Sequence, residues 1–133
     1  MTAPAQVTAI LGNEEPDYCV ALTARHHSWK ADEPAPQGGA DAGPRPFELV
    51  LAGLASCTAI TLRMYVRRKQ WTLGEVRVGV SLRKHGESFS IDRTVTHTGA
   101  LSQEQRTKLA DICERTPVTL LLKQGALIRT TVL

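Results

Sequence analysis

The segment Phe47–Ile60, FELVLAGLASCTAI, constrains the fold of this chain more than any other stretch of its sequence. Nearly every position in it is apolar or small, and the preceding Pro46 suits the first turn of a helix, where a missing N–H breaks no hydrogen bond. Successive helical residues turn by about 100°, so such a run leaves no polar face for solvent. A helix of this composition must be covered on all sides.

A chain of 133 residues has little material with which to surround a helix. Small residues at Ala52, Gly53, Ala55, Ser56 and Ala59 would let another backbone approach closely. We therefore expect a homodimer in which the central helices of two subunits meet across a large apolar interface. The alternative is a monomer whose helix lies against a curved sheet.

Length and composition predict one globular domain over residues 1–133, with 42% hydrophobic residues and a formal net charge of +3. The N-terminus lacks the charged and apolar regions of a signal peptide, and the apolar run is shorter than the roughly 20 residues that cross a bilayer. The positive charges are scattered apart from Arg67–Lys69 and form no basic stripe interleaved with aromatic residues, which argues against nucleic-acid binding. Three widely spaced cysteines do not resemble a disulfide framework. We expect a cytoplasmic protein without a membrane or nucleic-acid partner.

Local patterns predict an α+β fold in the order β-β-β-α-β-β-α-α-β. Ser102 and Gln105 form a capping box, and Thr116-Pro117 ends the helix that this box opens and begins another. A loop rich in glycine and proline, Asp32–Pro44, precedes the central helix. The predicted strands are Val7–Leu11, Tyr18–Ala24, His27–Ala31, Val76–Leu82, Ser88–Thr96 and Leu127–Leu133, and the predicted helices are Pro46–Gln70, one that begins after Ser102, and Val118–Gln124.

A single thiol, Cys57, sits in the middle of the apolar run. Free cysteine is often a small, inert core residue, so the pattern alone leaves its role open. A reactive thiol needs a lowered pKa, which requires a nearby cation or a helix N-terminus. Cys57 is about ten residues into the predicted helix, so the cation would have to come from elsewhere in the fold.

Four stretches of the sequence, ARHHSWKADEP, GGADAGP, RPFELVLAGLASCTAITLRMYV and ICERTPVTLLLKQG, resemble the OsmC/Ohr family of small bacterial proteins. The resemblance runs from about Ala24 to Gly125. It implies an intertwined α+β homodimer in which two long central helices are wrapped by antiparallel sheets. It also implies a thiol-dependent peroxidase that reduces organic hydroperoxides in oxidative-stress defence and uses neither a metal nor a bound organic cofactor.

In the family's reaction, a cysteine of the central helix attacks the peroxide and becomes a sulfenic acid. A second cysteine resolves it as a disulfide, and a thiol or dithiol reductant, often lipoyl-based, restores the pair. An arginine and a glutamate beside the first thiol keep it as the thiolate.

The resemblance places Cys57 at the position of the attacking thiol and Glu48 at the acidic position near the helix start. Nine residues along an unbroken helix make about two and a half turns, so the two side chains would point to opposite sides. Contact between them would need an irregular helix start or a partner subunit. Otherwise Glu48 is a first-turn carboxylate favoured by the helix dipole. Arg25 is the candidate cation and Arg45 its rival, and either could be a surface arginine.

The second cysteine is where this sequence departs from the family. The resolving thiol of the peroxidases immediately precedes a proline, and here Thr116 precedes Pro117. Cys113 lies three residues earlier, on the same helix face as Leu109 and Ile112, and could replace that thiol or simply fill the core. A cycle with one cysteine and an outside thiol also stays open.

Other candidates are weaker. Cys19 falls in a predicted strand and reads as a small core residue. His26 and His27 are adjacent, which on a strand turns them to opposite faces, and the sequence has no zinc-ligand spacing. We therefore predict a peroxidase with Cys57 as nucleophile; the alternative is a non-catalytic dimer that binds a small hydrophobic ligand in an interface cleft.

Overall fold

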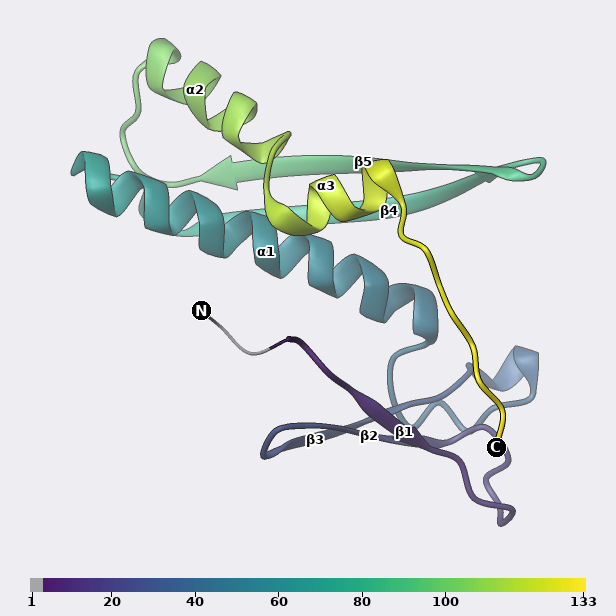
Figure 1. Ribbon diagram of the computed structural model, residues 1–133. Coiled ribbons are helices and arrows are strands. Elements are labelled where there is room, and N and C mark those ends of the chain that lie inside the picture. The colour runs from purple at the N-terminus through teal and green to yellow at the C-terminus, as the bar shows by residue number, and fades with distance from the viewer. Residues whose placement is uncertain (1–3) are drawn as a thin grey trace. The chain divides into compact units, whose positions relative to one another are not determined.

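The computed structural model describes residues 4–133, which form an α+β fold of helices and two small antiparallel sheets (Figure 1). The chain divides into two compact units, one that ends at Val50 and one that begins at Leu51. The division falls inside the long helix α1, Pro46–Lys69. The order of elements agrees with the sequence prediction up to the last helix.

The first unit contains a three-stranded antiparallel sheet in the order β1-β2-β3. Its strands are Thr8–Ile10, Val20–Ala24 and His27–Ala31. Ala24 pairs with His27, so Arg25 and His26 form a tight two-residue turn between β2 and β3. Arg25 has a left-handed φ of 55°, which places it in the turn rather than in a strand.

The loop after β3 is organised by the buried carboxylate of Asp32. Its oxygens accept hydrogen bonds from the backbone N–H groups of Glu33 at 2.7 Å, Ala40 at 3.3 Å and Ala42 at 3.1 Å. A short 3-10 helix, Ala35–Gln37, lies within this loop. Burial of the carboxyl opposes ionisation, but the three hydrogen bonds outweigh it and lower the pKa of Asp32. The loop is therefore a defined structure at neutral pH.

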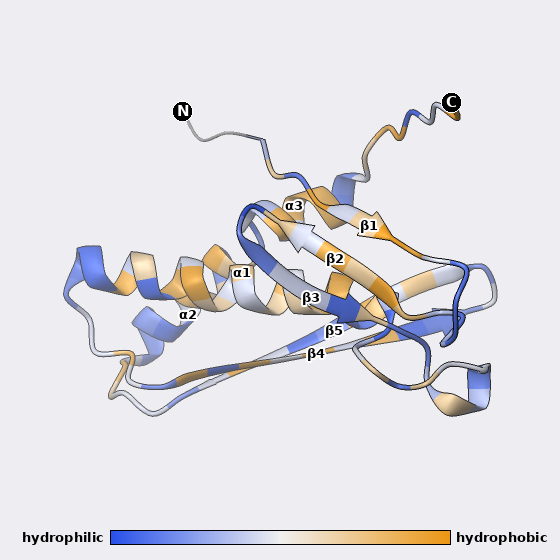
Figure 2. Cartoon of the chain, turned by 90° about the horizontal axis from the view of Figure 1, so that it is seen from below, coloured by the Kyte–Doolittle hydropathy of each residue, from blue (hydrophilic) through white to orange (hydrophobic). Residues whose placement is uncertain are grey.

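The second unit is built on a hairpin and the central helix. Strands β4, Val76–His85, and β5, Ser88–His97, pair over their whole length, and the predicted alternation is confirmed because the half-buried positions of β4 recur every second residue from Val76. On β5 the half-buried positions are Ile91, Arg93, Val95 and His97. This face of the hairpin carries α1 and α2, as Figure 1 and Figure 2 show from two directions.

The core of the second unit joins these elements. Helix α2, Gln103–Cys113, begins with the predicted capping box, in which Gln105 N–H donates to Ser102 Oγ at 3.1 Å and Ser102 N–H donates to Gln105 Oε1 at 2.8 Å. Helix α3, Pro117–Gln124, follows the Thr116-Pro117 break as predicted. The buried cluster of the core comprises Leu62, Val66, Leu73, Leu101, Leu109 and Cys113.

The final predicted strand, Leu127–Leu133, is not formed in the described chain. The segment leaves the end of α3 in an extended form without strand pairing (Figure 2). Its apolar side chains are among the most exposed described, with Leu127 at 78% and Ile128 at 83%. A strand requires a hydrogen-bonded neighbour, and sequence alternation alone does not supply one.

Helix α1 extends beyond the apolar run to Lys69, which agrees with the predicted helix Pro46–Gln70 to within one residue. By length and composition it could cross a membrane, with a mean hydropathy of 1.6 over its most apolar window. The core helix of a globular protein passes the same test. Its buried residues, Leu54, Thr58, Leu62 and Val66, recur every fourth position and include the core residues Leu62 and Val66.

The Asp32 loop gives a prediction about pH. Because the folded pKa of Asp32 is depressed, its stabilising contribution is present above the pKa of an unfolded aspartate, about 4, and is lost as pH falls through the lower folded value. We expect the amide protection factors of Ala40 and Ala42 in hydrogen exchange to fall in that acidic range and in Asp32→Asn at neutral pH. Asp41→Asn, in the same loop, should leave them unchanged; equal effects of the two variants would contradict this account.

Candidate functional site

Cys57 lies outside the buried stripe of α1. From the helical repeat, its side chain is about 100° around the axis from Thr58 and about 140° from Leu62. It is partly exposed, and on its own side of the helix Ile60 and Met64 are 55% and 61% exposed. The predicted nucleophile therefore stands on the apolar side of α1 that is not packed into the core.

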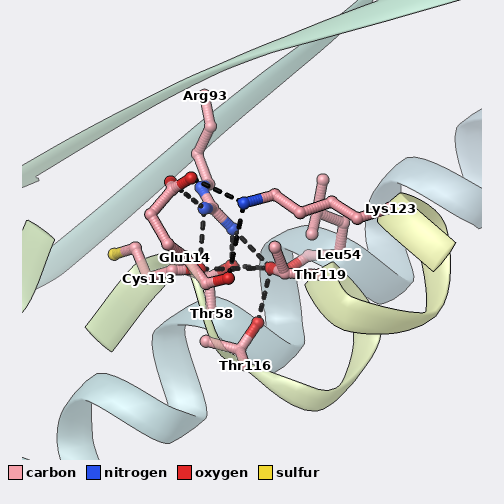
Figure 3. A network of polar contacts seen from close by, with 8 residues as sticks. All are labelled: Leu54, Thr58, Arg93, Cys113, Glu114, Thr116, Thr119 and Lys123. Carbon is pink, nitrogen blue, oxygen red and sulfur yellow. Dashed lines mark hydrogen bonds and ion pairs between the residues drawn. The ribbon is translucent and has the colours of Figure 1, made fainter. Parts of the chain in front are cut away.

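The most connected polar group near this part of α1 is the guanidinium of Arg93, on β5. Its side chain is only 12% exposed, because the strand directs it toward the helices. Nη1 donates to Thr58 Oγ1 at 3.0 Å and to Thr119 Oγ1 at 2.8 Å. Nη2 donates to the backbone oxygen of Cys113 at 2.7 Å and to Glu114 Oε2 at 3.2 Å, so one side chain joins three helices to the hairpin (Figure 3).

The hydroxyl groups around Arg93 complete one another's hydrogen bonds. Thr58 accepts from Arg93 and donates to the backbone oxygen of Leu54 at 2.8 Å. Thr119 accepts from Arg93 and donates to the backbone oxygen of Cys113 at 3.2 Å, which leaves Thr116 as the donor in their 2.6 Å contact. Within residues 4–133, every buried side-chain nitrogen and oxygen atom has a partner.

An ion pair between Lys123 and Glu114 lies on the solvent-exposed side of the Arg93 guanidinium. Lys123 Nζ lies 2.7 Å from Glu114 Oε1, while the other carboxylate oxygen of Glu114 meets Arg93. The hydrogen bond and charge of Lys123, followed by the charge of Arg93, lower the pKa of Glu114. We call the side chains of Thr58, Arg93, Glu114, Thr116, Thr119 and Lys123 the arginine cluster.

Cys113 contributes its backbone oxygen to the arginine cluster but not its thiol. Cys113 is 7% exposed and belongs to the core with Leu62 and Val66, and its thiol points away from the guanidinium in Figure 3. Burial raises the pKa of Cys113, and the charge of Arg93 offsets only part of that rise. The thiol is therefore protonated and weakly nucleophilic at neutral pH.

The other predicted site residues belong to the first unit. Glu48 Oε1 accepts from the backbone N–H of Arg45 at 3.0 Å and lies 3.9 Å from Arg45 Nε, with both side chains about half exposed. The structure thus joins Glu48 to the rival cation Arg45 at the start of α1. Arg25 lies in the turn before β3, and the roles of Arg25, Glu48, Cys57 and Cys113 in catalysis stay predictions.

The structure adds little support for a functional role of Cys19, His26 or His27. Cys19 is a partly exposed free thiol just before β2. The rings of His26 and His27 lie 4.1 Å apart between centroids, so they do not face opposite ways as expected, because His26 is in the turn. No group of three or more metal-binding side chains occurs in the part of the chain that the structure describes.

The arginine cluster is not among the features predicted from the sequence. A charged residue in an alternating strand is ordinarily expected to face solvent. The available signal was its parity, since Arg93 falls on the same side of β5 as Ile91 and Val95. Thr58 and Thr119 carried no such signal, because a threonine in a helix pattern fits a core or a surface equally well.

Fold and site together define a small α+β protein built on a long apolar helix that carries a partly exposed thiol. The family model for OsmC-like proteins matches residues 38–131. The chain therefore belongs to the OsmC-like protein family, as its sequence motifs indicated. No curated protein matches the sequence.

Solved structures of similar fold agree with this assignment. An OsmC-like protein from Mycoplasma pneumoniae is 20% identical, with a TM-score of 0.77, over 94% of this chain and 90% of that one. An organic hydroperoxide resistance protein from Legionella pneumophila is 17% identical, with a TM-score of 0.67, over 92% and 91%. The organic hydroperoxide resistance protein OhrB of Bacillus subtilis is 23% identical, with a TM-score of 0.63, over 92% and 93%. At these identities the likeness establishes the fold.

The arginine cluster predicts that replacing two different arginines of the hairpin lowers the free energy of unfolding by unequal amounts. Arg93→Met should lower the free energy of unfolding by about 2–4 kcal/mol, because it removes several charged hydrogen bonds to buried acceptors. Arg83→Met removes an exposed ion pair with Asp92 and should cost less than about 1 kcal/mol. Urea denaturation of both variants measures the difference; equal losses would show that the cluster does not stabilise the fold.

Proposed function

We propose that this protein is a thiol-dependent peroxidase that reduces organic hydroperoxides, with Cys57 as the attacking thiol. The observation that carries the proposal is the partly exposed position of Cys57 on the uncovered side of an otherwise apolar helix. A thiol that packed only in the core of its own chain would belong to the buried stripe, as Thr58 and Leu62 do. Membership of the OsmC-like family, with structural neighbours named as organic hydroperoxide resistance proteins, supports this reading.

The proposed reaction is a two-electron oxygen transfer to sulfur. The Cys57 thiolate attacks the outer oxygen of the hydroperoxide, the O–O bond breaks, and the leaving alkoxide takes a proton to become an alcohol. Cys57 becomes a sulfenic acid, and a thiol or dithiol, such as a reduced lipoyl group, returns it to the thiol. The protein supplies no metal or organic cofactor in this scheme.

Arg25 and Glu48 are proposed to tune the thiol. A cation near sulfur favours the thiolate, and a carboxylate can hold that cation in place. Arg45 competes with Arg25 for this role, and its contact with Glu48 supports it. Replacing Arg25 and Arg45 in turn, and measuring how fast Cys57 is oxidised, shows which arginine activates the thiol.

A homodimer is part of the proposal, because one chain leaves apolar surface uncovered. Ile60 and Met64 are exposed on α1, and apart from Gly53, its chain neighbours and the adjacent backbone of the helix, no described atom lies within 4 Å of where a side chain at Gly53 would begin. Close approach of a second helix would use this surface. The extended segment 127–133, with exposed Leu127 and Ile128, can gain strand pairing only from a neighbour, and a second subunit would provide one.

The same exposed apolar surface beside Cys57 favours a second candidate, a non-catalytic dimer that binds a small hydrophobic ligand. The threonine at position 116, where the family's peroxidases carry a thiol, also favours it. We propose a cytoplasmic location for either function, since three free thiols suit a reducing compartment.

Peroxidase activity is tested with cumene hydroperoxide and an external dithiol. We expect Cys57→Ser to lower the rate by at least about a hundredfold, because it removes the nucleophile. Cys19→Ser is the matched control and should retain the rate. If the wild-type protein shows no oxidation that depends on Cys57, while a hydrophobic ligand binds it, the second candidate is correct.

The dimer is tested with Met64→Glu, which places a charge on the uncovered side of α1. Burying an unpaired carboxylate at an apolar interface is costly, so we expect the dimer to dissociate at concentrations where the wild type remains paired. Met64→Leu keeps the surface apolar and should behave as wild type. Sedimentation velocity measures both, and a wild-type protein that sediments as a monomer would refute the dimer.

A further inference from the structure

We infer that Cys57 is reduced by an external thiol and that Cys113 has no part in resolving its oxidised form. This inference rests on the proposed peroxidase function and specifies how its cycle closes. Its basis is the arginine cluster, which holds the end of α2 in place while the Cys113 side chain lies in the core.

The first argument is the placement of the two sulfur atoms. Cys113 shares the core with Leu62 and Val66, which lie about 140° and 180° around α1 from Cys57. A disulfide needs the two side chains to face each other with Cα atoms within about 7 Å. Rotating α1 to bring Cys57 round would expose Leu62 and Val66, which are among the most deeply buried side chains described.

The second argument is the anchoring of Cys113 itself. Its backbone oxygen accepts hydrogen bonds from Arg93 Nη2 at 2.7 Å and Thr119 Oγ1 at 3.2 Å. These bonds hold the backbone of Cys113, so a shift of α2 that carried the thiol toward Cys57 would break them and leave a nearly buried guanidinium short of an acceptor. Cys113 as a whole residue is only 7% exposed, so it offers little surface to a sulfenic acid on another subunit.

The third argument concerns Thr116, which is 1% exposed and whose hydroxyl donates to Thr119 at 2.6 Å. Thr119 in turn donates to the Cys113 oxygen, so Thr116 is part of the support that anchors Cys113. Thr116 and Thr119, at the start of α3, thus help to fix the position of the end of α2.

The closing steps then balance with two external thiol molecules. The sulfenic acid of Cys57 condenses with the first thiol to form a mixed disulfide and releases water. A second thiolate attacks the external sulfur of that mixed disulfide, which releases the Cys57 thiolate and an external disulfide. A dithiol such as dihydrolipoamide supplies both sulfur atoms from one molecule.

The test uses the full-length reduced protein, one equivalent of cumene hydroperoxide, no added thiol, and peptide mass spectrometry with dimedone. We expect a dimedone adduct on Cys57, an unmodified Cys113, and conversion of Cys57 to the sulfinic acid when the peroxide is in excess. Added 2-mercaptoethanol should give a mixed disulfide at Cys57. Cys113→Ala, supplied with external thiol, should turn over within about twofold of the wild type.

A disulfide between Cys57 and Cys113, or between Cys57 and Cys19, within or between subunits, would overturn the inference and leave the peroxidase intact. Complete absence of Cys57 oxidation would remove the proposed function and the inference together, so the two failures are distinguishable. The wild-type measurement stands even if Cys113→Ala is poorly folded.

Discussion

The packing of the second unit is organised around one nearly buried charge, the guanidinium of Arg93. A nearly buried cation costs several kcal/mol unless acceptors replace the water it has lost. Those acceptors come from Thr58 on α1, the end of α2, and Thr119 on α3. Because all of them must meet one planar group, their helices cannot shift independently along the hairpin, and the arginine cluster specifies how the apolar surfaces pack.

This constraint divides α1 into two sides with different tasks. The stripe Leu54, Thr58, Leu62 and Val66 is occupied by the chain's own core and by the arginine cluster. The side that carries Cys57, Ile60 and Met64 is left free. An all-round apolar helix in a short chain therefore does not mean a helix enclosed by its own chain. The bond between Arg93 and Thr58 fixes the rotation of α1, and so decides on which side the Cys57 thiol appears.

Features governed by local sequence were predictable. Alternation from Val76 predicted the hairpin, the Ser102–Gln105 box predicted the start of α2, and Pro117 predicted the break before α3. Features that need a distant partner were not. Segment 127–133 has the pattern of a strand but no pairing strand, and Arg93 has the charge of a surface residue but the parity of a core one. The thiol at Cys57 was found through its position in the apolar run, whereas the hydroxyl groups that orient its helix could be recognised only once three elements were brought together.

At position 116, at the start of α3, a hydroxyl that completes the hydrogen bonds of the arginine cluster excludes a thiol that could take part in a redox reaction. Its hydroxyl is a strong donor to Thr119, and this bond frees the Thr119 proton for the Cys113 oxygen. A thiol at that position is a weak donor with a larger atom, and would leave Thr119 poorly partnered next to a buried cation. The chain therefore gains a fully satisfied cluster at the place where a second redox sulfur would otherwise stand. In the proposed peroxidase cycle, this arrangement leaves Cys57 without a second sulfur from α3, so the electrons that restore it would come from an external thiol.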